Sequence, residues 1–440
     1  MTLKQFGLIL LLNITLVSAK AQDWMSIKDT TDPVVVLTSE FNNPYRQPLA
    51  GMGWEDGLHI SENGLYLYCT YVPIDFLSFA LNGGLPNNFS TDYLRGADEF
   101  GMDLMTNPIG ADEWLHSDIL YASRASTEDA FEEWVLSDME RLFYSEGAPT
   151  PLFDGETVMW MSFTSNDNPT NNMDIFIIED TEANPSGIGT AIASPITTDY
   201  NEDNPHITQL GGDSLILFFD SDNRPGGLGD IDIWYSISED DGVSWNEPVN
   251  PSSLNSTEKE HQPFLHFDQQ KEVWFLYYSA VDEESGKLAI FRKEQSAENN
   301  WDNWEEAELV ISAGNSAGIG EPTLTQNGDL SFVVVYEDPE LNSIYDRFDS
   351  DPWMAERKDF SNLSSEKESQ IQLYPNPAKD LLHLKTQKSI ERLQILNSTG
   401  QVVHQQTQDF SQIQIDHLPA GFYHLKLISD EVMTLPFVKN

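Results

Sequence analysis

Acidic residues recur at the entrance of a short apolar segment that appears five times along the chain. Each copy contains a proline or, once, a leucine, and the acids stand one to three residues before it. The candidate catalytic acids are Glu55, Asp56, Glu146, Glu202 and Glu321, and Glu260 and Asp203 stand at matching positions. Two carboxyl groups can hydrolyse a glycosidic bond, one protonating the leaving oxygen and the other activating water or attacking directly. A repeat also produces such a ring when the acids accept hydrogen bonds from backbone amides and brace neighbouring strands, and both interpretations stay open.

Histidines form a second candidate group, for ligand binding. His59 and His206 occupy equivalent positions of the repeated segment, and His261 lies close by in the alignment. Imidazole groups can move protons or ligate metals. Only two of the five copies carry the histidine, and strongly acidic surroundings are a poor host for an anionic polymer.

Four aspartates form the only candidate metal site. Asp220, Asp222, Asp230 and Asp232 flank a glycine-rich turn and could supply oxygen ligands to calcium. Aspartates also stabilise turns by accepting backbone N–H groups, which is the competing interpretation. No cofactor other than calcium is predicted.

These residues belong to short strands that repeat. Prolines at 149, 205, 263 and 322 are spaced by 56, 58 and 59 residues, and a second pattern, exemplified by Ile231–Tyr235, keeps the same period. Its other copies begin at Ser117, Met173, Leu288 and Ser343. A period of about 57 residues holds four short strands with their turns, which is one propeller blade. Five copies predict a five-bladed β-propeller over residues 22–359.

Two further features of this propeller can be predicted. The first repeat is longer than the others by an insert at about residues 76–113, which we expect to protrude over one face as a binding loop. Asp32–Ser39 resembles an outer strand but precedes the first repeat. We therefore expect it to close the ring as the outer strand of blade five.

The two ends of the chain differ from the middle. Residues 1–21 have the pattern of a cleavable signal peptide, with Lys4 before an apolar run and Ala19-Lys20-Ala21 at the cleavage site. Residues 360–370 form a polar linker, and 371–440 contain alternating strands that predict a small antiparallel β-sandwich. No later segment is apolar enough to cross a bilayer, so no transmembrane segment is expected in the mature protein.

Charge and cysteine content exclude several functions. The chain has 72 acidic and 23 basic residues, a formal net charge of −49, and the C-terminal 70 residues are neutral. Such a field repels nucleic acids and anionic membranes. Cys69 is the single cysteine, so no intrachain disulfide can form, and its apolar neighbours indicate a buried, inert thiol.

The C-terminal segment resembles the sorting domain of the type IX secretion system of Bacteroidetes. The resemblance rests on four motifs in order: Tyr374-Pro375-Asn376-Pro377, Ser398–Val403, Leu418–Tyr423 and Phe437-Val438-Lys439. It implies that residues 371–440 bind the secretion machinery and that the mature protein is extracellular or at the outer cell surface.

The central segment resembles two propeller families. Phe219–Trp234 is similar to WD-type (WD40-like) repeats, and Ser238–Trp245 is similar to the Asp-box of sialidases, in which the Asp accepts turn amides and the Trp packs between blades. The arginine pattern of sialidases is absent, which argues against that chemistry. Glu146–Pro149 resembles the acid-bearing segment of five-bladed arabinanases and fructanases. We expect a surface propeller that binds a glycan or a surface protein, with a glycoside hydrolase as the alternative.

Overall fold

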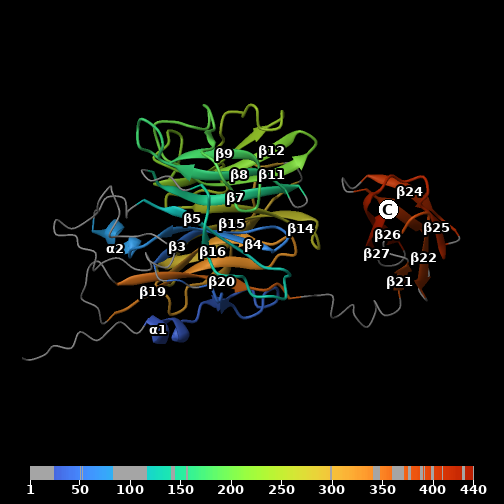
Figure 1. The fold of residues 1–440 in the computed structure, drawn as a ribbon, viewed down its shortest axis with the longest axis horizontal. Coiled ribbons are helices and arrows are strands. Elements are labelled where there is room, and N and C mark those ends of the chain that lie inside the picture. Colours follow the sequence, from blue (N-terminus) through green and yellow to red (C-terminus); the bar gives the residue numbers. More distant parts are fainter. Residues whose placement is uncertain are drawn as a thin grey trace, which may run out of the picture.

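The computed structural model describes residues 24–49, 51, 53–82, 116–139, 144–154, 157–297, 300–339, 347–358, 371–374, 378–386, 390, 392–397, 401–408, 410–428 and 432–439. The signal peptide, the linker and most of the predicted insert lie outside these residues. The described part is all-β apart from two short helices, and residues 24–358 have a β-propeller fold (Figure 1).

The propeller is built from five successive antiparallel units, each beginning with an inner strand. The inner strands are β3 (Trp54–Ile60), β7 (Glu146–Asp154), β11 (Glu202–Gly211), β14 (His261–Asp268) and β18 (Gly318–Leu324). The second strands are β4 (Tyr66–Val72), β8 (Thr157–Ser165), β12 (Ser214–Asp222), β15 (Val273–Asp282) and β19 (Leu330–Glu337). The third strands are β5 (Asp118–Ser123), β9 (Asp174–Thr181), β13 (Ile231–Ser238), β16 (Lys287–Glu294) and β20 (Phe348–Ala355). The outer strands are β6 (Val135–Leu136), β10 (Thr190–Ala191) and β17 (Glu308–Ser312), and in unit three a single bridge joins Tyr235 to Val249.

Buried strands explain the apolar runs of the sequence. The apolar run Leu215–Phe219 lies inside β12, and all five of its side chains are at most 1% exposed. Alternate side chains of β12 point to opposite faces and enter two clusters: Ile216 and Phe218 pack toward unit four, whereas Leu217 and Phe219 pack toward unit two. A strand buried on both faces is apolar throughout, which is why no alternation appears here.

Each inner strand contains a β-bulge at the same place. The bulge residue has a left-handed backbone, with φ between 46° and 58°, in all five units: Gly57, Ala148, Asn204, Gln262 and Glu321. A residue of the repeated segment, usually proline, follows it. A bulge leaves one residue out of the ladder, so the missing N–H of proline is tolerated there. The repeated motif of the sequence is therefore the bulge of the inner strand.

The bulges are held by side chains of the preceding unit. Thr70 Oγ1 of unit one accepts the N–H of Ala148 at 2.9 Å, and Asp220 of unit three accepts the N–H of Gln262 at 2.7 Å. Gln262 Oε1 of unit four in turn accepts the N–H of Glu321 at 3.1 Å. Because a buried N–H without an acceptor is costly, these bonds fix each unit against the one before it.

The predicted closure of the ring is wrong in its detail. Within Asp32–Ser39, β1 (Val34–Val35) pairs with β17, so it extends unit four. The segment that flanks β20 of unit five is β2 (Tyr45–Arg46), which pairs Tyr45 with Met354. The N-terminal segment thus contributes to two units, and the strand that flanks unit five lies eleven positions further along the chain than Val34–Val35.

Unit five departs from the repeat in its third strand. The last copy of the second pattern, Ser343–Tyr345, lies outside the described residues, and the third strand is β20, which begins at Phe348. The first unit contains α2 (Phe76–Leu81) at the start of the predicted insert. Asp75 caps this helix and accepts the N–H groups of Arg347 and Phe348 at 2.6 and 2.8 Å, so α2 is attached to the beginning of β20.

A second helix, α1 (Trp24–Thr30), also packs against unit five (Figure 1). Lys28 is 5% exposed and its Nζ lies 2.8 Å from Asp349 and 2.6 Å from Asp351 of β20. These charges raise the pKa of Lys28 to about 12 against the opposing effect of burial. The ion pairs hold the N-terminal helix on the ring.

The C-terminal segment has a core of its own. One sheet has the order β21 (Ile371–Tyr374), β22 (Leu381–Thr386), β25 (Gln412–Gln414). The other has the order β24 (Val402–Gln406), β23 (Arg392–Leu396), β26 (Gly421–Ile428), β27 (Val432–Lys439). Leu382, Ile395, Ile413 and Leu425 from both sheets share one buried cluster.

The turn after β13 has the hydrogen bonds expected from its sequence. Asp240 accepts the N–H of Ser244 at 2.8 Å and its hydroxyl at 2.7 Å. Trp245 packs against the cluster shared by units two and three. Gly242 has φ 78°, and an added Cβ would lie 1.9 Å from the ring of Trp160 in unit two.

We predict that Gly242→Ala lowers the free energy of unfolding by about 2–4 kcal/mol, the sum of left-handed strain and overpacking. Gly286→Ala is the matched control, because Gly286 has φ 69° but no atom within 4 Å of the added Cβ. The control should lose only about 1 kcal/mol. All eleven tryptophans precede the C-terminal segment, so tryptophan fluorescence during urea unfolding reports on the propeller alone. Equal losses in the two variants would contradict the contact with Trp160.

Candidate functional site

The five bulges meet at the axis of the propeller. They and the two residues after each line a cavity of about 30 Å³. That volume holds about one water molecule, so the axis is closed to larger ligands at this depth. A ligand can therefore reach only the mouth, at the end where the inner strands begin. The α2 segment and the start of β20 lie at the same end, because Trp54 and Ser350 are paired.

Three carboxyl groups come together at this mouth. Asp56 and Asp203 precede the bulge residue and are half-buried, and Glu321 is itself a bulge residue and is 8% exposed. Burial raises the pKa of all three, and the neighbouring acids raise the pKa of Glu321 and of Asp203 further. The charge of Asp56 is a further cause of the raised pKa of Glu321, because neighbouring carboxylates in a poorly solvated place disfavour each other's ionised form.

The remaining candidate acids brace the loops that enter the inner strands. Glu55 accepts the N–H of Gly51 at 2.8 Å, and Glu202 accepts the N–H of Thr198 at 3.0 Å. Glu260 makes the same bond to Ser256 at 2.9 Å, four residues before it in every case. Glu146 lies within 3.4 Å of the Ser165 hydroxyl and is 1% exposed. At these positions the acidic side chains hold neighbouring segments of the chain in place through hydrogen bonds.

Burial affects the ionisation of these bracing acids. Desolvation raises the pKa of Glu202 to about 7, against the hydrogen bonds from Thr198 and the charge of Arg224 3.2 Å away. The pKa of Glu55 is raised well above its usual value by burial and by Asp351 and Asp349.

The structure brings two of the three candidate histidines together. The rings of His59 and His206 are 6.3 Å apart, and Phe264 lies 4.2 Å from His206 and 5.7 Å from His59. Burial lowers the pKa of both histidines, to about 4 for His206. They are therefore neutral near pH 7, and both line the small cavity at the axis. His261 stands one residue before a bulge, at the position of Asp56 and Asp203, and burial lowers its pKa to about 4.

The four aspartates proposed for calcium have separate protein partners. Asp220 pairs with Asp203 in the ladder, at the position that Thr70, Thr164 and Ser279 occupy in other units. Its carboxylate accepts hydrogen bonds from Gln262 and from the Asn204 amide at 2.8 Å. Asp222 accepts two bonds from Asn201, and Asp232 accepts the N–H groups of Leu228 and Gly229. Asp230 uses its carbonyl oxygen to accept the N–H of Asn223.

Within the part of the chain that the structure describes, no group of three or more His, Cys, Asp or Glu side chains is arranged to hold a metal ion. Cys69 is fully buried on β4, and burial raises the pKa of its thiol well above the usual range.

The sequence interpretation missed two members of the axial site as functional candidates. Asp203 was recognised as an acid of the repeat but not placed beside Asp56, and Gln262 was overlooked. Gln262 is hydrogen-bonded through its side chain to Glu321. The alignment of the five copies contained the signal for both residues, because Asp203 occupies the position of Asp56, and Gln262 occupies the position of Glu321, directly before the proline.

Asp220 makes the stability of the propeller depend on pH. Burial, followed by the charge of Asp203, raises its pKa to about 7 in the folded state. Between about pH 4 and pH 7 the folded chain keeps a proton that the unfolded chain has released. The free energy of unfolding therefore falls as pH rises through this window, by at most about 1.4 kcal/mol per pH unit for this group, and is constant above it.

We predict that Asp220→Asn reduces this slope, because asparagine keeps an acceptor oxygen for Gln262 but does not titrate. Urea unfolding at pH 5, 6 and 7, followed by tryptophan fluorescence, measures it. Glu283→Gln, an exposed position in the β15–β16 turn, is the control. An unchanged slope in Asp220→Asn would show that the carboxyl group is ionised in the folded chain across this range.

Comparison with solved structures finds glycoside hydrolases. The catalytic domain of an α-L-arabinofuranosidase of family GH62 from Coprinopsis cinerea is 10% identical over 73% of this chain and 98% of its own, with a TM-score of 0.45. A family 117 glycoside hydrolase from the marine bacterium Zobellia galactanivorans is 13% identical over 72% and 90%, with a TM-score of 0.44. These are distant likenesses between β-propellers, from which nothing follows about activity.

Three further findings concern the whole chain, its helices and its C-terminal end. No curated protein matches the sequence. No helix among the described residues is long and apolar enough to span a membrane. Residues 372–436 match the family model of the secretion system C-terminal sorting domain. The chain is therefore a protein with a type IX sorting domain, exported to the cell surface or the extracellular space.

Proposed function

We propose that residues 22–359 form a five-bladed propeller that binds a neutral glycan at the mouth of its axis, through Asp56, Asp203 and Glu321. The observation that carries this proposal is the clustering of these three carboxyl groups without a basic partner among the described residues. Three other buried acids of the propeller have a cation beside them: Glu202 has Arg224, Asp268 has Arg357, and Asp349 has Lys28. Glu55, Glu146 and Asp220 accept hydrogen bonds from neutral groups of neighbouring segments. Uncompensated acids destabilise a fold, so their retention at an accessible mouth indicates function.

The protonation state of the cluster suits hydroxyl groups. A carboxyl group with a raised pKa keeps its proton to a higher pH, and in that form it can donate a hydrogen bond, whereas an ionised neighbour accepts one. Each sugar hydroxyl both donates and accepts, so adjacent hydroxyls can bridge Glu321 and Asp56. The Gln262 side chain adds an amide at the same place. The net charge of −49 disfavours anionic polysaccharides as ligands.

Hydrolysis is the second candidate function, and the raised pKa of Glu321 favours it. A general acid must be protonated near the working pH while a second carboxylate stays ionised. The two acids of glycosidases are roughly 5–10 Å apart. Asp56 and Asp203 both lie close enough to Glu321 for their charges to raise its pKa, so either aspartate would be its partner in such a reaction.

We predict that the double variant Asp56→Asn/Glu321→Gln binds neutral oligosaccharides at least about tenfold more weakly than the parent, through loss of two hydrogen bonds to charged or proton-sharing groups. Calorimetric titration with plant and algal oligosaccharides measures binding, and release of reducing ends measures hydrolysis. The variant should be as stable as the parent at pH 8 or more stable, because it removes two buried acids whose ionised forms are disfavoured.

Glu283→Gln serves as the exposed control. Binding that persists in the double variant, or a parent that binds none of the oligosaccharides, would contradict the proposed site. Turnover by the parent that disappears in Glu321→Gln would instead assign the hydrolase.

The sorting domain gives a separate prediction about destination. A chain that lacks residues 418–440 loses all of β26 and β27, and with them half of the second sheet. We expect it to remain in the periplasm, whereas full-length protein with Glu283→Gln reaches the surface or the medium. Cell fractionation and immunoblotting measure this. Truncated protein outside the cell would show that these strands are dispensable for sorting.

A further inference from the structure

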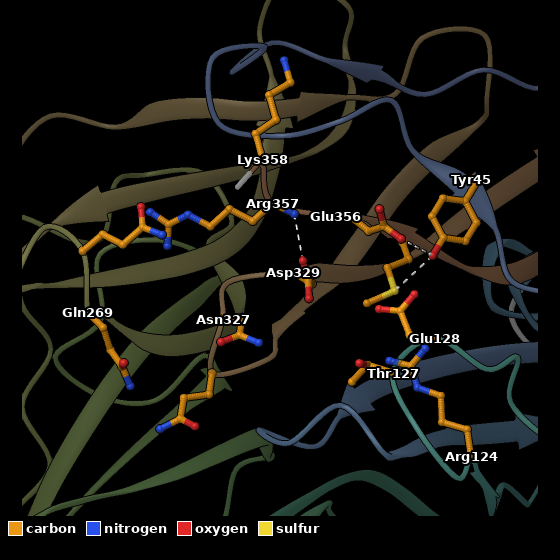
Figure 2. Close-up of a pocket in the computed structure, with 13 residues that line it drawn as sticks. Tyr45, Arg124, Thr127, Glu128, Gln269, Asn327, Asp329, Glu356, Arg357 and Lys358 are labelled. Atoms are coloured by element: carbon orange, nitrogen blue, oxygen red, sulfur yellow. Dashed lines mark hydrogen bonds between the residues drawn. The ribbon is translucent and has the colours of Figure 1, made fainter. Parts of the chain in front are cut away.

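A second cavity lies at the opposite end of the propeller from the axial carboxyl groups. Its volume is about 440 Å³, and its walls come from the turns that follow the inner strands of units four and five. The β5–β6 segment of unit one and the chain after β20 complete it (Figure 2). These segments are far apart in the sequence and meet where β2 pairs with β20.

Charged groups of this pocket are balanced, unlike those of the chain as a whole. Arg124, Arg357 and Lys358 line the cavity together with Glu128, Asp329 and Glu356. An anion or a cation would therefore gain little from the pocket itself, and an anion would also be repelled by the net charge of −49. A neutral ligand can use both kinds of group.

Hydrogen bonds hold several of these groups in place. Arg357 is 8% exposed, its guanidinium lies 2.6 Å from Asp268, and its backbone N–H donates to Asp329 at 2.9 Å. The Nε atom of Arg357 is buried and has no hydrogen-bond partner among the described residues. The Tyr45 hydroxyl donates to Glu356 at 3.1 Å. The charged part of the wall is thus preorganised and retains an unused donor group.

Four carboxamide side chains complete the wall. Gln269, Gln270, Gln326 and Asn327 are exposed, and no hydrogen bond joins their side chains to other described residues. Figure 2 shows Gln269, Asn327 and Asp329 around one space, with the Tyr45 ring at its edge. Each carboxamide offers a donor and an acceptor.

We propose that this pocket binds a neutral sugar residue and is a second glycan site, on the face opposite the axial mouth. Its volume lies within the range of about 300–1,000 Å³ typical of small-molecule sites. Alternating donors and acceptors match the hydroxyl groups of a pyranose, and the half-exposed ring of Tyr45 offers an apolar face to its C–H groups. The argument is independent of the axial site, since the two share no residue.

The test uses the full chain with Gln270→Ala/Asn327→Ala. These side chains make no hydrogen bonds to the described protein, so the thermal midpoint should not change. Xylotriose, maltotriose and laminaritriose are the neutral probes, trigalacturonate is the anionic probe, and calorimetry gives affinity and stoichiometry. We expect about tenfold weaker binding of at least one neutral trisaccharide, from the loss of two hydrogen bonds. Asn246→Ala, an exposed amide in the turn after β13, is the control and should bind like the parent.

The axial variant Asp56→Asn/Glu321→Gln separates this proposal from the previous one. Binding that survives in the axial variant and is lost in Gln270→Ala/Asn327→Ala supports the pocket even where the axial proposal fails. Unchanged affinity for every neutral trisaccharide in Gln270→Ala/Asn327→Ala would overturn it, as would a parent that binds none of them or that prefers trigalacturonate.

Discussion

The left-handed bulge of each inner strand is the constraint on which the rest of the propeller depends. The bulge removes one N–H from the ladder of strand hydrogen bonds. In three units the N–H of the bulge residue donates to a side chain of the preceding unit, namely Thr70, Asp220 or Gln262. A unit that shifts relative to its neighbour would leave a buried N–H without an acceptor, at a cost of about 1–3 kcal/mol. The same bulges line the axis and leave a cavity of only about 30 Å³ there. Rigidity and a closed axis therefore have one cause.

This arrangement also decides which acids are available for chemistry. Three residues before the proline, the glutamates lie buried and accept N–H groups from the entering loops, as Glu55 and Glu202 do. One or two residues before it, the backbone turns and directs Asp56, Asp203 and Glu321 toward the mouth. The raised pKa of Glu321 reflects this crowding, because adjacent carboxylates in a poorly solvated place disfavour each other's ionised form. This crowding destabilises the ionised propeller at its mouth, whereas Glu202, Asp268 and Asp349 each have a cation beside them.

Closure of the ring has consequences at the opposite end. The N-terminal segment pairs first with unit four through β1 and then with unit five through β2, and Lys28 fixes the helix before it to Asp349 and Asp351. Tyr45 of β2 thereby reaches Glu356, beside the turns of units four and five. The polar pocket exists because these segments converge there. Its residues do not share a position of the repeat, which is why no repeat pattern pointed to it.

The sequence by itself determined the repeat, the strands and the destination. The period of about 57 residues predicted the inner strands because proline marks the bulge, and the motifs of residues 371–440 predicted the sorting domain that the family model matches. Tertiary structure alone decided the closure, in which Val34–Val35 pairs with unit four instead of unit five. It also decided the roles of the acids. Glu202 stands three residues before its proline and accepts the N–H of Thr198 in the entering loop, whereas Glu321 stands one residue before its proline and is itself the left-handed bulge residue at the axis. Spacing along the chain records which residues are equivalent, whereas the direction of a side chain depends on a backbone turn and on neighbours from another unit.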